Sequence, residues 1–121
     1  RAALEAMAYQ THDLLTAFAA DGAHWSELRV DGGMAANNWM VQDLANVLDL
    51  PVERPAFVET TALGAAMLAA VGSGLHRGLE EAAVMRGTVE RFDPALAEPV
   101  RASRLAGWAG AMDRALLGLD P

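Results

Sequence analysis

Hydrophobic residues recur at steps of three and four in two long stretches of the chain, which is the spacing of one face of a helix. The first stretch predicts an amphipathic helix over residues 2–20. Its apolar stripe comprises Leu4, Met7, Thr11, Leu14 and Phe18. The second stretch predicts a helix over residues 35–48, which Pro51 prevents from continuing. Its apolar stripe comprises Met40, Leu44, Val47 and Leu48.

A third helix is predicted over residues 59–76, where alanine and glycine dominate. Small side chains allow close approach of backbones, so we expect this helix to lie tightly on a sheet or on another helix. Thr60 or Thr61 is suited to be its N-cap. Gly72 and Gly74 are suited to end it.

The last third of the chain predicts two more helices separated by a loop. Residues 79–85 predict a short helix, and residues 103–117 predict an amphipathic one. The stripe of the latter comprises Leu105, Trp108, Met112 and Leu116. The segment VERFDPALAEP, at 89–99, is interpreted as a loop.

Two short segments have the character of strands. In ELRVD, at 27–31, Leu28 and Val30 share one face, and PVERP, at 51–55, is flanked by prolines that suit an edge or the end of a strand. Strands that alternate with helices indicate an α/β fold. Two strands are too few for a sheet that is stable by itself. We therefore expect a helix-rich α/β fold with a short, incomplete sheet, whose missing strands belong to sequence outside this chain.

The segment RVDGGMAANN, at 29–38, joins the first predicted strand to the second predicted helix. A hairpin is excluded because the residues after Gly33 follow a helical period. Two interpretations remain open. The turn is an ordinary glycine-rich connection, or it is a place where a phosphate meets unpaired backbone N–H groups at the start of a helix, with Asn37 within reach of a sugar or base. For Asp31 we favour bonding to nearby backbone N–H groups or capping of the helix over a role as general base or magnesium ligand, because no second carboxylate or histidine lies at a useful local spacing.

Composition excludes several classes of function. The formal net charge is −7 with scattered basic residues, which argues against nucleic-acid and membrane-surface partners. The longest apolar run, 62–71, is shorter than the roughly 20 residues that cross a bilayer. Cysteine is absent, which excludes disulfides and thiolate sites and fits a cytoplasmic protein. His12, His24 and His76 are too dispersed to predict a metal site. The chain begins inside a helical pattern, so we expect it to be part of a longer protein.

Several motifs, in this order and spacing, resemble the C-terminal part of the FGGY carbohydrate kinase family. They are DGG at 31–33, NN at 37–38, PVERP at 51–55 and TALGAA at 61–66. The stretch LEAMAYQTHDLL at 4–15 and the stretch GWAGAMDRAL at 107–116 match helices on either side, so that the resemblance covers nearly the whole chain. Within the family, VERP followed by ETTALGAA is more similar to the glycerol kinases than to the xylulose or gluconate kinases.

The resemblance implies an actin-like fold of two ribonuclease H-type domains, with ATP and substrate in the cleft between them. Residues 1–121 would form the C-terminal part of the second domain. The Gly32-Gly33 turn would bind the nucleotide, with Gly33 against the phosphates and Asn37 near the adenosine. The implied reaction transfers the γ-phosphoryl group of ATP to glycerol with Mg²⁺ present, giving glycerol 3-phosphate.

The catalytic Asp and the polyol-binding residues of the family belong to sequence upstream of Arg1. We therefore expect this chain to hold no catalytic residue and no metal ligand, and to be inactive alone. We also expect it to self-associate or to belong to a homo-oligomer, because its incomplete sheet exposes edges and apolar faces. Two alternatives stay open: the same portion of another FGGY sugar kinase, such as a xylulokinase, and a non-catalytic helical interaction domain.

Overall fold

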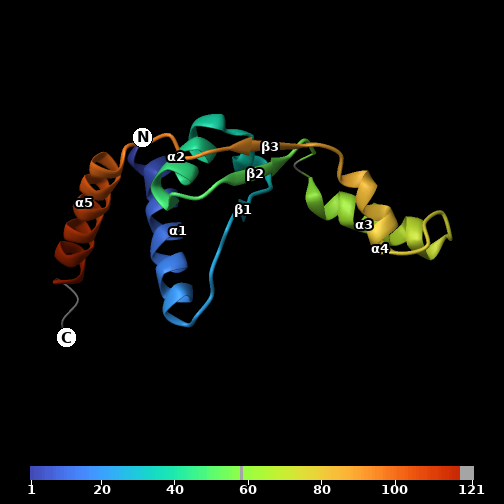
Figure 1. Ribbon diagram of the computed structural model, residues 1–121, viewed down its shortest axis with the longest axis horizontal. Helices are drawn as coiled ribbons and strands as arrows, with labels where there is room; N and C mark the ends of the chain where they lie inside the picture. Colours follow the sequence, from blue (N-terminus) through green and yellow to red (C-terminus); the bar gives the residue numbers. More distant parts are fainter. Residues whose placement is uncertain (58, 118–121) are drawn as a thin grey trace.

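The computed structural model describes residues 1–57 and 59–117 as an elongated arrangement of helices around a small sheet. Its elements are α1 (Ala2–Ala20), β1 (Leu28–Arg29), the 3-10 helix η1 (Gly33–Ala36), α2 (Asn38–Leu48), β2 (Val52–Pro55), α3 (Thr60–Gly72), α4 (Leu79–Ala82), the 3-10 helix η2 (Ala83–Arg86), β3 (Val89–Phe92) and α5 (Glu98–Leu116). In Figure 1, α1 and α5 lie at one end, α2 and the sheet in the middle, and α3 and α4 at the other end. None of the described helices is long and apolar enough to span a membrane.

The sheet has the order β1-β2-β3. Strand β1 runs parallel to β2, and η1 and α2 form the crossover between them. Strand β3 then pairs with β2 in the antiparallel sense, which places Phe92 opposite Val52. The predicted α/β class, with a short sheet and many helices, is therefore confirmed. The prolines around β2 mark the ends of a central strand, because a ladder tolerates a missing N–H there.

The prediction of a loop over residues 89–99 is wrong at both ends of that segment. Its first four residues form β3, and α5 begins at Glu98, where we expected its start near residue 103. Only Phe92 of β3 is buried, so the segment has no periodic apolar signal. The strand forms because its backbone completes the ladder of β2. Ion pairs that cross from Arg54 to Glu90 and from Arg91 to Glu53 accompany this pairing.

The hydrophobic core centres on α2, which lies between α1 and the sheet. All four residues of the predicted α2 stripe are buried, as predicted. The predicted stripe of α1 is wrong, because Met7, Leu14 and Phe18 are 39 %, 53 % and 40 % exposed. The face that packs on the core is rotated from that stripe and carries Ala8 and Leu15. Ala8 is the buried residue of this helix, and a single alanine in an alanine-rich helix does not stand out in the apolar periodicity.

Helix α3 packs against α4 and η2 rather than against the α1–α2 core. Met67 and Ala70 are its buried residues, whereas Leu68 is 63 % exposed. The expected tight packing over its small residues is therefore limited to one side. The predicted threonine N-cap is also wrong, because the cap position is Glu59, whose side chain makes no capping hydrogen bond, and Thr60 is the first helical residue.

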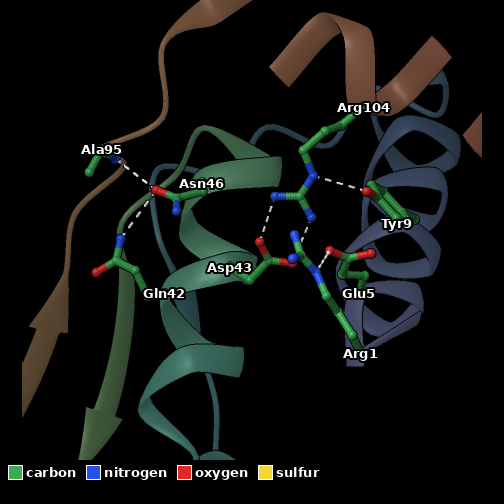
Figure 2. A network of polar contacts seen from close by, with 8 residues as sticks. All are labelled: Arg1, Glu5, Tyr9, Gln42, Asp43, Asn46, Ala95 and Arg104. Carbon is green, nitrogen blue, oxygen red and sulfur yellow. Dashed lines mark hydrogen bonds and ion pairs between the residues drawn. The ribbon is translucent and has the colours of Figure 1, made fainter. Parts of the chain in front are cut away.

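A polar cluster attaches α5 to α1 and α2 (Figure 2). The Arg104 guanidinium donates to both carboxylate oxygens of Asp43, over 2.6 and 2.9 Å, and its Nε donates to the Tyr9 hydroxyl over 2.9 Å. The Asp43 contact raises the pKa of Arg104 above its usual value. Trp108 stacks on Tyr9 and donates to Asp13 over 2.7 Å, so this tryptophan anchors α5 on α1.

Candidate nucleotide-binding site

The turn between β1 and α2 begins with two glycines that have different requirements. Gly32 has φ 80° and ψ 175°, a backbone conformation that side chains rarely tolerate. Gly33 lies outside the left-handed region, and a Cβ added to it would meet no heavy atom within 4 Å. The fold therefore explains glycine at position 32. It does not explain glycine at position 33, which leaves open space in front of that backbone.

A 3-10 turn follows the glycines, where we expected an α-helix to start directly. Within η1, the N–H of Ala35 donates to the Gly32 carbonyl over 3.0 Å. Among the described residues, no acceptor pairs with the backbone N–H groups of Gly33 and Met34. Both residues are exposed at the surface. Unpaired N–H groups at the start of a helical turn are suited to bind an anion.

Asn37 is the N-cap of α2. Its side-chain Oδ1 accepts a hydrogen bond from the N–H of Met40 over 3.2 Å, which fixes the direction of the amide. The Nδ2 group makes no hydrogen bond within the described part of the chain, and the residue is exposed. Asn37 therefore stabilises the helix and still presents a donor beside the turn. Trp39, which follows it closely, is 44 % exposed.

Asp31 accepts a hydrogen bond from the Thr60 hydroxyl at the start of α3. Our expectation that it bonds to nearby backbone N–H groups or caps the helix is therefore wrong, because its partner is a side chain 29 residues away and the N-caps of η1 and α2 are Gly32 and Asn37. No group of three or more His, Asp or Glu residues able to hold a metal ion occurs among residues 1–57 and 59–117. Asp31 therefore belongs to no such group, and it lies directly before the Gly32-Gly33 turn.

A cleft of about 710 Å³ opens beside Asp31, between β1, α3 and η2. Its walls combine charged, polar and apolar residues. The residues that line it include Arg29, Asp31, Glu53, Thr60, Gly64 and Arg86. Gly64 leaves this wall without a side chain, although an added Cβ there would meet no heavy atom within 4 Å. Asp31, which precedes the Gly32-Gly33 turn, lines the cleft, whereas the two glycines do not.

Sequence reasoning missed Arg54, which contacts the turn from the sheet. Its Nη1 donates to the carbonyl oxygen of Ala35 over 2.6 Å, and its other end group pairs with Glu90. The residue is the Arg of the VERP motif, so its presence in that motif was the one available signal. The contact joins positions that are 19 residues apart and leaves no local pattern.

The profile of the C-terminal domain of the FGGY family of carbohydrate kinases matches residues 1–73. This match covers more than half of the chain, and the chain belongs to that family. Among curated proteins, it is 54 % identical over 118 residues to a glycerol kinase from Rhodospirillum centenum, covering 98 % of this chain and 24 % of the relative. A glycerol kinase from Alcanivorax borkumensis is 53 % identical over 114 residues, covering 93 % of this chain and 23 % of the relative. The chain thus spans about a quarter of the length of these relatives.

Solved structures of similar proteins agree on the fold. A glycerol kinase from Plasmodium falciparum, crystallised with ADP, superposes with a TM-score of 0.76 at 25 % identity over 92 % of this chain and 22 % of that chain. A xylulose kinase from Lactobacillus acidophilus superposes with a TM-score of 0.73 at 18 % identity over 98 % of this chain and 24 % of that chain. The chain therefore has the fold of a portion of the actin-like kinases.

Proposed function

We propose that residues 1–121 form the C-terminal part of the second domain of a glycerol kinase. The observation that carries this proposal is the 54 % identity to a glycerol kinase over 98 % of the chain. The whole enzyme would transfer the γ-phosphoryl group of ATP to glycerol and release glycerol 3-phosphate. This chain would contribute one side of the nucleotide site and neither the catalytic base nor the glycerol-binding residues.

The Gly32-Gly33 turn is the part of this chain that we assign to the nucleotide. The unpaired N–H groups of Gly33 and Met34 are suited to the phosphate oxygens, and the free Nδ2 of Asn37 is suited to an acceptor on the adenosine. The ADP in the Plasmodium falciparum relative supports an adenine nucleotide as the ligand. Mg²⁺ would accompany ATP, and we assign none of its ligands to this chain.

Binding, orientation and charge neutralisation are what a protein supplies in phosphoryl transfer. Here, backbone donors on a turn fixed to the sheet would hold the phosphates in one position. Such donors need no reorganisation when charge moves during the reaction. We further propose a cytoplasmic location and a homo-oligomeric enzyme, since both ATP and glycerol are small soluble metabolites and apolar side chains of α3 are exposed in this chain.

A substrate panel tests the proposal. The full-length protein that contains this chain should form ADP from ATP with glycerol present, measured by a coupled assay, and glycerol 3-phosphate should accumulate with it. Xylulose and gluconate at equal concentration are the comparison substrates. Faster turnover with xylulose than with glycerol would indicate a xylulokinase-like enzyme. No turnover with any of the three substrates would favour a non-catalytic domain.

A further inference from the structure

Arg54 connects the sheet to the turn that we assign to the nucleotide. It lies on β2, the central strand, and its side chain is only 11 % exposed. One arm of the guanidinium donates to the carbonyl oxygen of Ala35 over 2.6 Å, and the other pairs with Glu90 on β3. The guanidinium carbon lies 5.1 Å from the centre of the Phe92 ring. Three different contacts thus fix the position of this charge.

The Ala35 carbonyl lies near the end of η1, where carbonyl groups lose their partners within the helix. Ala35 itself is 1 % exposed, so water has little access to this part of the turn. An unpaired buried carbonyl is costly, and a hydrogen bond from a charged donor is among the stronger ones in proteins. The contact with Arg54 is therefore a specific attachment of the turn to the sheet.

We propose that Arg54 is a positioning residue for ATP. It holds Ala35, and through Ala35 it holds the N–H groups of Gly33 and Met34 in the direction of the phosphates. This inference rests on the proposed function. A lysine would not replace Arg54, because one ammonium group on a flexible stem cannot span Ala35 and Glu90 with a planar fork.

The test compares three variants of the full-length protein. Arg54→Met removes the fork and keeps an apolar stem of similar length, and Arg54→Lys keeps the charge. The matched control is Arg91→Met, on the neighbouring strand. Arg91 pairs with Glu53 and Asp93 over 3.5 and 2.9 Å, is 48 % exposed, and makes no hydrogen bond to the turn in the described chain.

For Arg54→Met we expect the apparent KM for ATP to rise about tenfold, because small displacements of a binding group are costly in phosphoryl transfer. The KM for glycerol should stay within about twofold of the unsubstituted value, and kcat should fall less than the KM for ATP rises. Arg54→Lys should raise the KM for ATP by about threefold. Arg91→Met should leave both KM values unchanged. Hydrogen exchange should be faster at the amides of residues 33–36 in Arg54→Met than in Arg91→Met.

If the parent enzyme is active and the KM for ATP of both Arg54 variants stays within twofold of the unsubstituted value, the positioning role of Arg54 is overturned. The proposed function would not be affected by that result. Equal changes in Arg54→Met and Arg91→Met would overturn it too, because they would indicate a general loss of stability. If Arg54→Met does not fold, Arg54→Lys tests the proposal. A rise of the KM for ATP relative to the KM for glycerol supports the positioning role, and an unchanged ratio overturns it. A parent protein without ATP-dependent phosphorylation would show that the proposed function has failed, and this inference with it.

Discussion

Substitution of Gly33 separates nucleotide binding from folding. Its φ lies outside the left-handed region, and an added Cβ meets no heavy atom within 4 Å. Gly33→Val should therefore change the free energy of unfolding by less than about 1 kcal/mol. In the ATP complex, the same side chain would occupy the space through which a phosphate approaches the backbone N–H. Loss of one hydrogen bond to a charged group costs about 1.5–3 kcal/mol, which weakens ATP binding about ten- to a hundredfold.

The assay uses the full-length protein and three measurements. The melting temperature without ATP should match that of the unsubstituted protein, the Kd and KM for ATP should rise, and the KM for glycerol should stay unchanged. Gly32→Ala is the matched control, because its φ of 80° makes any side chain strained. That variant should lose about 1–3 kcal/mol of stability. Unchanged ATP affinity in Gly33→Val would refute the assignment of the phosphates to this turn.

Four further variants or preparations test other parts of the structure. Asn37→Asp should keep the α2 cap and weaken ATP binding, since aspartate caps equally well but has no Nδ2 donor; unchanged ATP affinity would contradict a nucleotide contact. Asp31→Asn should reduce kcat by less than about 100-fold, and a loss near 10⁴-fold would identify Asp31 as a general base. Arg104→Met leaves Asp43, 5 % exposed, without its partner and should cost about 3 kcal/mol in denaturant unfolding, whereas a cost below about 1 kcal/mol would show that water reaches the carboxylate. Residues 1–121 alone should self-associate in light scattering through the exposed apolar side chains of α3, and a monomer at high concentration would contradict this.

The parts of the fold that were predicted from the sequence depend on local signals. Helix α2 has an apolar stripe and a following proline, so its end at Leu48 and its buried face agree with the prediction, whereas its start is three residues later than predicted because η1 precedes it. Strand β3 lacks such a signal, because three of its four residues are exposed and its stability comes from pairing with β2. The buried face of α1 depends on how closely α2 approaches. Its identity is therefore a property of the packed pair and could not be obtained from α1 alone.

The candidate site also has one part that local sequence signals predict and another part that only tertiary contacts determine. Strand, glycine turn and helix follow one another along the chain, so Gly32, Gly33 and Asn37 could be selected from the sequence. The contacts that hold the turn could not, because Arg54 reaches Ala35 across 19 residues and Thr60 reaches Asp31 across 29. Their partners are the backbone carbonyl of Ala35 and the carboxylate of Asp31. Neither type of partner produces a recognisable spacing.

The two long-range contacts couple the turn to different parts of the molecule. Arg54 ties its far end to the central strand, whereas Thr60 ties its near end to α3. Strand β2 is paired with β1 on one edge and with β3 on the other, whereas α3 leaves Leu68 63 % exposed and borders the open cleft. It follows that the turn which we assign to the phosphates is attached to the sheet at one end and to α3 at the other.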